Sequence, residues 1–140
     1  MTALLSGQRI DNWIDGERVA PANGEYLESV DPSVGKAWIE VPAGDARDVE
    51  AAVAAARAAF AGPWRAMPSM QRAALLRAAA VEIAKHAEEL ATIECRDNGK
   101  PIAEALPGDL PSVSEMMNYW GGQADKIHGE TVEISPLSHN

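Results

Sequence analysis

The chain has 140 residues, of which 46% are hydrophobic and 24% are charged, and its net charge is −9. This composition is ordinary for a single soluble globular domain. The acidic balance argues against nucleic acid as a partner, because it leaves no basic face for a phosphate backbone. No apolar run approaches the roughly 20 residues that cross a bilayer, so no membrane partner is expected either. The single cysteine, Cys95, excludes an intrachain disulfide and favours a cytoplasmic location.

The first forty residues predict a small antiparallel β element of hairpins over residues 11–41. Its first turn is Asp15-Gly16, a dipeptide that suits the positive φ angles of a type I′ turn. Two further strands are expected at residues 26–30 and 37–41. The segment between them, residues 31–35, contains proline and glycine and reads as a turn.

Helices are predicted over residues 45–126. Asp45 can cap the first of them, and Asp48 completes a variant of the capping box. Apolar residues then recur at helical spacing as far as Phe60, and Gly62-Pro63 ends the pattern. This spacing predicts a helix packed against the rest of the protein.

A long helical segment between Pro68 and Pro101 is the centre of the predicted fold. One apolar face is formed by residues at helical spacing: Leu76, Ala79, Ala80, Ile83 and Ala87. A break is expected near His86, which divides the segment into a helical pair. Asn98-Gly99 then supplies residues that tolerate the left-handed conformation at a helix end.

A further helix is expected after Pro107-Gly108, which should break a short helical turn before it. Asp109 and Ser112 compete as its N-cap, the latter through a capping box with Glu115. Its apolar face should contain Val113, Met116, Met117, Trp120, Ala124 and Ile127. Gly121-Gly122 should interrupt this helix, and a short strand is expected at residues 131–134.

Few side chains have the setting of a catalytic or metal-binding group. Cys95 has acidic neighbours, which do not favour a reactive thiolate, so it reads as a small buried residue. Glu94 lies on an apolar face, where a carboxylate needs a cation or an N–H group as a partner, and Lys100 is one option. A structural ion pair is favoured over a role as a general acid or base. The three histidines, His86, His128 and His139, lack a spacing that would bring two of them to one metal.

An aromatic and methionine cluster near the end of the helical region is the remaining candidate for binding. Its members are Met116, Met117, Tyr119 and Trp120. These residues can line a ligand pocket, but at helical spacing they are more often core, and core is the favoured interpretation. The residues alone therefore predict a soluble α+β domain without a visible active site.

The ordered series of motifs resembles the N-terminal part of NAD(P)-dependent aldehyde dehydrogenases, over about residues 10 to 135. The motifs run from the hairpin Asn12-Trp13-Ile14-Asp15-Gly16-Glu17 through Ala55-Ala56-Arg57-Ala58-Ala59-Phe60, Trp64 and Arg72 to Asn98-Gly99-Lys100-Pro101, Tyr119-Trp120-Gly121-Gly122 and Ala124-Asp125-Lys126-Ile127-His128-Gly129. The segments ending at Pro101 and Lys126 make the resemblance specific. One departure is Gly122-Gln123, where Gly-Trp is common in the family.

The resemblance implies an α/β, Rossmann-like fold for the intact enzyme, of which this chain is an α+β part, mostly helical after its β element. Residues 1–126 should form the N-terminal part of the cofactor-binding domain. Residues 127–140 should begin the oligomerisation arm. The implied partners are the rest of the aldehyde dehydrogenase chain and further copies in a dimer or tetramer.

The resemblance also implies the chemistry of the intact enzyme. A cysteine adds to the aldehyde, hydride passes to NAD or NADP, and a glutamate activates the water that releases the acid. The family places these groups in later segments, and Cys95 does not match the catalytic motif. We therefore expect no catalytic or cofactor-binding residue in this chain, which reads as a truncated, inactive piece that binds no cofactor alone. The alternative is a standalone, non-catalytic helical interaction domain.

Two further expectations follow from the resemblance. In several family members a sodium or potassium ion lies near the position of Asp97, with backbone oxygens near that of Val30, so these two residues are the candidate metal site. Loss of the nucleotide-binding sheet should also uncover the apolar helix faces built on Val53, Phe60, Leu76 and Ile83. Together with the open strand at residues 131–134, these faces favour self-association.

Overall fold

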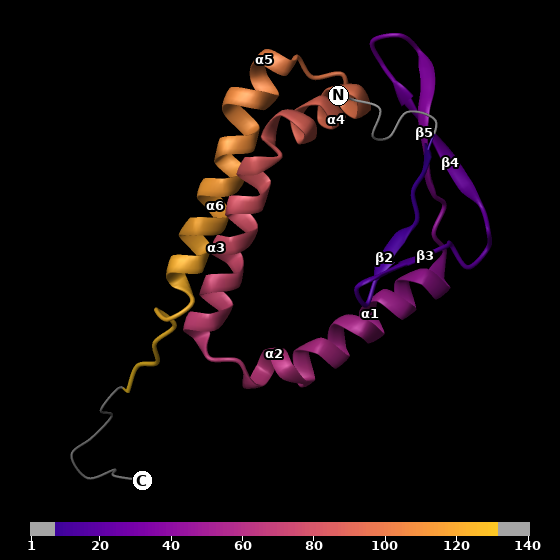
Figure 1. Ribbon diagram of the computed structural model, residues 1–140. Helices are drawn as coiled ribbons and strands as arrows, with labels where there is room; N and C mark the ends of the chain where they lie inside the picture. The colour runs from indigo at the N-terminus through magenta and orange to yellow at the C-terminus, as the bar shows by residue number, and fades with distance from the viewer. Residues whose placement is uncertain (1–7, 132–140) are drawn as a thin grey trace.

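The structure, a computed structural model, describes residues 8–131 of the chain (Figure 1). The elements in chain order are β1 (Gln8–Arg9), β2 (Asn12–Ile14), β3 (Glu17–Val19), β4 (Tyr26–Asp31), β5 (Lys36–Pro42), α1 (Ala46–Ala61), α2 (Pro63–Ala66), α3 (Ser69–Lys85), α4 (Ala87–Asn98), α5 (Ile102–Glu104), the π-helical η1 (Ala105–Asp109) and α6 (Leu110–Gln123). The fold is mixed α+β and mostly helical, as predicted. The strand expected at residues 131–134 lies outside the described residues, apart from its first position.

The strands form two small sheets. β2 and β3 make an antiparallel hairpin whose turn residues Asp15 and Gly16 both have positive φ, at 55° and 80°, as the sequence predicted. The second sheet has the strand order β1-β5-β4, with β4 antiparallel to β5 and β1 parallel to it. The two-residue β1 was not predicted, because it is too short to show an alternating pattern.

Helix α1 begins at the predicted cap and then leaves the sheet with little cover. Asp45 and Asp48 form the capping box. The apolar side chains beyond it are exposed, Val49 by 61% and Phe60 by 66%. The expectation of a packed helix is therefore wrong for this chain. In Figure 1, α1 and α2 form one side of an open frame between the strands and α3.

Helices α3 and α6 lie side by side and antiparallel (Figure 1). The contact uses the predicted face of α3, where Ala73 and Ala80 are buried. Across the interface, the Ser114 hydroxyl donates to the Ala80 carbonyl at 3.1 Å. Gly121 faces the Ala73 carbonyl so closely that an added Cβ would lie 3.3 Å from that oxygen. Small residues thus bring the two helix backbones together.

The predicted apolar face of α6 is mostly uncovered, which corrects the sequence interpretation. The inward face of this helix contains Leu110, Ser114, Met117 and Gly121. Val113, Met116 and Trp120 are instead exposed by 44%, 56% and 57%. Spacing alone identified an apolar stripe, but the smaller residues of the neighbouring stripe allow the closer approach to α3. Gly121-Gly122 also lies within the helix and does not interrupt it.

The connection from α4 to α6 contains a small cluster of buried apolar residues. Ala91, Ala105 and Leu110 form this cluster. The expected break at Pro107-Gly108 is wrong, because the chain passes through both residues as the π-helical η1 and continues directly into α6. A helix that continues from a preceding turn needs no side-chain cap. Accordingly neither Asp109 nor Ser112 forms one, and the Ser112 hydroxyl donates to the Gly108 carbonyl at 2.7 Å.

Candidate functional site

The C-terminal half of α4 packs against β4, and this junction contains both residues of the predicted cation site. The Asp97 carboxylate accepts a hydrogen bond from the Ser29 hydroxyl at 2.6 Å. That hydroxyl in turn accepts one from the indole N–H of Trp38 at 3.2 Å. Since Ser29 directly precedes Val30, the fold brings Asp97 to the strand segment that contains Val30.

A bulge lies at the same point of the sheet. Ser29 pairs with Ile39 and Val30 pairs with Ala37, so Trp38 is the extra residue on β5. A bulge disturbs the backbone ladder and re-aims the groups beside it. The resulting set of a carboxylate, a hydroxyl and strand carbonyls is the oxygen chemistry that hard cations use. Within residues 8–131, no three His, Cys, Asp or Glu side chains cluster as metal ligands, so backbone oxygens would have to supply most of the ligands.

A second polar contact joins α4 to the end of β4. The Asp31 carboxylate is buried and accepts hydrogen bonds from the Ser33 amide at 2.9 Å and the Ser33 hydroxyl at 2.6 Å. Nε of Arg96 lies 3.6 Å from the other carboxylate oxygen. The Ser33 hydrogen bonds, helped by the Arg96 charge, hold the pKa of Asp31 below its ordinary value. The Arg96 guanidinium also lies over the Trp38 ring, 4.9 Å from its centroid.

Lys100 connects the end of α4 to η1. Its ammonium lies 3.0 Å from a Glu94 carboxylate oxygen, so Glu94 has the partner that the sequence suggested as one option, and the ammonium also pairs with Asp109. The hydrogen bonds to Asp109 and then Glu94 raise the pKa of Lys100 above its ordinary value. Gly99 makes this turn possible with a φ of 80°, and its α-carbon backs onto Pro32 of the β4–β5 turn.

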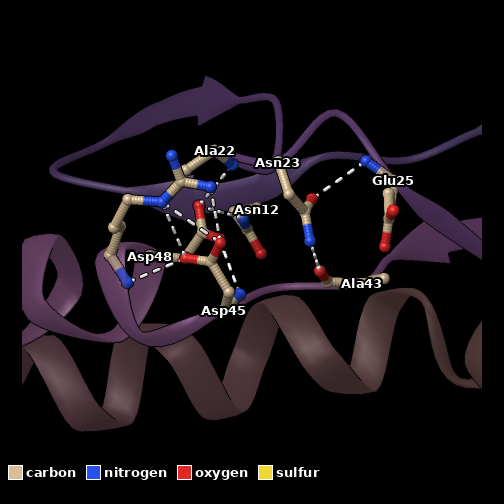
Figure 2. Close-up of polar contacts among 8 residues, drawn as sticks. Asn12, Ala22, Asn23, Glu25, Ala43, Asp45 and Asp48 are labelled. Atoms are coloured by element: carbon tan, nitrogen blue, oxygen red, sulfur yellow. Dashed lines mark hydrogen bonds and ion pairs between the residues drawn. The ribbon is translucent and has the colours of Figure 1, made fainter.

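Asp48 is the centre of a separate polar joint between the strands and α1 (Figure 2). One carboxylate oxygen accepts from the Ala22 amide at 3.0 Å and from the Asn12 side chain at 3.3 Å. The other accepts from the Asp45 amide at 2.8 Å. The sequence predicted the cap but missed that the same carboxylate reaches the β2–β3 hairpin and the turn after it.

The residues considered for catalysis occupy structural or exposed positions. Cys95 is half-buried rather than buried, and it packs against the Ala91–Ala105–Leu110 cluster. His86 is exposed between α3 and α4, with Nδ1 3.3 Å from a Glu89 carboxylate oxygen. His128 is exposed, and His139 lies outside the described residues.

The methionine and aromatic cluster of α6 is not core, in contrast to the favoured interpretation. Met116, Tyr119 and Trp120 are each more than half exposed, and only Met117 turns inward. Tyr119 and Trp120 pack edge to face, with ring centroids 5.2 Å apart. Met116, Tyr119 and Trp120 thus give α6 an exposed surface that is largely aromatic.

The sequence did not reveal the residues that fix the turns between consecutive elements. Arg72 is the clearest case: its guanidinium donates to the Met67 carbonyl at 2.5 Å and lies 5.9 Å from the centroid of the Trp64 ring. It thereby fixes the turn between α2 and α3. Arg72 belongs to the family motifs given above, and its position just inside a helix start after Pro68 was the only signal of its role.

No helix within residues 8–131 has the length and apolar content to span a membrane.

Comparison with known proteins decides the family. The model of the aldehyde dehydrogenase family matches residues 19–140, which is most of the chain. The chain belongs to this family. Aldehyde dehydrogenase family 2 member B4, mitochondrial, of Arabidopsis thaliana is 42% identical over 120 residues, covering 85% of this chain and 22% of the relative. An aldehyde dehydrogenase of Aspergillus niger is 42% identical over 133 residues, covering 95% of this chain and 27% of the relative.

Solved aldehyde dehydrogenases have the same arrangement of elements. The NAD⁺ complex of the Bacillus cereus aldehyde dehydrogenase superposes with a TM-score of 0.88 at 39% identity, covering 91% of this chain and 26% of that chain. A structure from Burkholderia cenocepacia gives a TM-score of 0.86 at 40% identity, covering 90% and 26%. The chain thus spans about a quarter of the length of the relatives it matches.

Proposed function

We propose that this chain serves as the N-terminal segment of an enzyme that oxidises an aldehyde to a carboxylic acid with NAD or NADP. In this role α1, α3 and α6 buttress the cofactor domain, and the residues from 127 onward begin the oligomerisation arm. The catalytic cysteine and the general-base glutamate would come from the rest of the enzyme, together with the nucleotide-binding segment. Lys100, Arg96 and Asp48 are structural residues in this proposal.

The proposal rests on the match, at about 40% identity, between this chain and a quarter of the length of several aldehyde dehydrogenases. The apolar faces of its own helices are exposed, which agrees with that match. Phe60 and Trp120 are exposed by 66% and 57%. Surfaces of this kind are costly on a free domain and normal where another part of the same fold packs. The alternative of a standalone interaction domain has no comparable support, because the relatives are aldehyde dehydrogenases.

The proposal is tested with the purified 140-residue chain. We expect no NAD-dependent oxidation of a small aldehyde and no tight NAD binding, because the reacting groups belong to the remainder of the enzyme. Cys95→Ala is the control variant, and it should behave like the parent chain. Turnover that is present in the parent chain and abolished in Cys95→Ala would contradict the assignment of a structural role to Cys95.

The predicted monovalent cation site is part of the same proposal. Asp97 would contribute its carboxylate and Val30 its backbone carbonyl, and the contact between Asp97 and Ser29 supports placing the two elements together. A sodium or potassium ion held there would tie α4 to β4. Its role would be structural, because its ligands come from the elements that join the helices to the sheet.

Assembly and location are the remaining parts of the proposal. We infer a homo-oligomer, a dimer or tetramer, in the cytoplasm; the exposed apolar side chains of α1 and α6 and the acidic, cysteine-poor composition support this inference. Light scattering at micromolar concentration tests the association. A monomer that is unchanged when Val132 and Ile134 are both replaced by Lys would contradict a role for the arm.

A further inference from the structure

The chain contains two Asn-Gly dipeptides, Asn23-Gly24 and Asn98-Gly99. In such a pair the glycine nitrogen can attack the side-chain amide carbon of the asparagine, because glycine offers little steric resistance and much backbone freedom. Ammonia leaves with the proton of that nitrogen, and a five-membered succinimide forms. Water then opens the ring at either carbonyl, giving aspartate or isoaspartate. The reaction needs only water and enough local motion for ring closure.

The two dipeptides differ sharply in the space around them. Gly24 has φ of 74° and lies in an exposed turn, where a Cβ on this glycine would have nothing within 4 Å. Its amide makes a single turn hydrogen bond, to the Pro21 carbonyl at 2.8 Å. Ring closure here requires the loss of this bond and of the two hydrogen bonds of the Asn23 side chain, but no separation of packed segments.

Gly99 also has one hydrogen-bonded amide, but unlike Gly24 it is packed against another segment of the chain. Its amide closes α4 by donating to the Cys95 carbonyl at 3.0 Å, and a Cβ on it would lie 3.2 Å from that of Pro32. The next residue, Lys100, is fixed by its ion pairs. Ring closure at Asn98 would require the end of α4 to come away from the β4–β5 turn.

The side-chain amide of Asn23 makes two hydrogen bonds that the carboxylate formed by deamidation could not both make. Its Nδ2 donates to the Ala43 carbonyl at 2.8 Å, while its Oδ1 accepts from the Glu25 amide at 2.9 Å (Figure 2). A carboxylate at this position keeps the acceptor and loses the donor. It would also face the Ala43 carbonyl oxygen with a negative charge, close to Asp45 and Asp48.

We propose that Asn23 is a site of spontaneous deamidation and that its conversion loosens the joint between the strands and α1. Asn98, with the same neighbour in sequence, is protected by its packing. The isoaspartate product adds one backbone atom within the turn that presents the Ala22 amide to Asp48. Deamidation during storage therefore weakens the contacts between the strands and α1, and it leaves the α4–β4 junction intact.

Peptide mapping of the complete chain tests the site. Trypsin separates the two asparagines into residues 19–36 and residues 97–126, since Lys100 is followed by Pro101. After incubation of the native chain, we expect deamidation of Asn23 to exceed that of Asn98 several-fold, by mass spectrometry and by isoaspartyl methyltransferase labelling. In denaturant the two rates should become similar. Equal rates in the native chain, or no conversion at Asn23, would overturn the proposal.

The consequence is tested with Asn23→Asp, compared with Asn118→Asp. Asn118 is a suitable control because its Nδ2 also donates to a carbonyl, that of Ser114 at 3.0 Å, on the exposed side of α6. Asn23→Asp should increase hydrogen exchange at the Ala22 and Ala43 amides several-fold, and Asn118→Asp should leave both unchanged. Unchanged exchange in Asn23→Asp would show that the joint does not depend on this amide.

Discussion

Arg96 on α4 lies between Asp31 and the Trp38 ring, with Nε 3.6 Å from the Asp31 carboxylate. The planar guanidinium of Arg96 thus attaches α4 to the sheet in two ways: its edge pairs with the Asp31 carboxylate, and its face stacks on the Trp38 ring. We expect Arg96→Lys to lower stability by about 1 kcal/mol, because an ammonium keeps the charge but cannot stack in this way. The measurement is the urea midpoint, with Arg57→Lys on the exposed part of α1 as the control. Equal midpoints for both variants would contradict the role of stacking.

Asp31 should make stability dependent on acid pH. Its pKa in the folded chain is below the ordinary value of 3.8, so the unfolded chain binds a proton more readily than the folded one. The stabilisation is complete above that value and is lost as the pH falls through the lower pKa of the folded chain. Between neutral pH and pH about 2, the melting temperature should therefore fall less steeply in Asp31→Asn than in the parent chain.

The matched control for this pH experiment is Glu50→Gln, which removes one negative charge from the exposed surface of α1. It should keep the parent's acid dependence. If Asp31→Asn and Glu50→Gln have the same pH profile, then the Ser33 and Arg96 contacts do not stabilise the carboxylate.

Gly121 and Gly122 are neighbours in α6 with opposite environments. A Cβ at Gly122 meets open space, so Gly122→Ala should stabilise the chain by about 1 kcal/mol through helix propensity. A Cβ at Gly121 would lie 3.3 Å from the Ala73 carbonyl oxygen. Gly121→Val should therefore destabilise the chain by about 1–3 kcal/mol, since α3 and α6 must separate. Thermal unfolding measures both, and a stabilising Gly121→Val would contradict the close approach of these helices.

The sequence predicted the elements well, because their ends depend on local chemistry. The Asp15-Gly16 turn, the Asp45–Asp48 cap and the left-handed Gly99 each follow from which backbone conformations and hydrogen bonds those residues allow. The π-helical passage through Pro107-Gly108 was missed, since the favourable packing of Ala105 and Leu110 overrides two residues that locally end helices.

The candidate site was less predictable because it depends on contacts between distant segments. The Ser29–Asp97 hydrogen bond joins residues 68 positions apart, and no local pattern encodes it. The face of α6 that packs on α3 was also misassigned. The face that contains Trp120 is more apolar, but the face that contains Gly121 lets the two helix backbones approach more closely. Pairing of Glu94 with Lys100 was predictable, because both lie at one helix end.

The cation proposal predicts a specific effect of potassium or sodium. At constant ionic strength, replacing choline chloride by potassium or sodium chloride should raise the melting temperature of the chain, because a bound ion stabilises the folded state. Asp97→Asn should remove this dependence, and Asp125→Asn, at an exposed position, should retain it. A dependence of equal size in Asp97→Asn would rule out Asp97 as a ligand.

A chimera in which residues 1–140 replace the corresponding N-terminal portion of the Bacillus cereus aldehyde dehydrogenase tests most directly whether this chain can serve as the N-terminal segment of such an enzyme. We expect aldehyde-dependent formation of NADH by the chimera and none by the Bacillus cereus enzyme that lacks this portion. Phe60→Asp combined with Trp120→Asp should abolish the gain, because both side chains would lie against the remainder of the enzyme. A chimera that folds and binds NAD like the parent enzyme yet oxidises no aldehyde would show that residues 1–140 cannot serve as this segment.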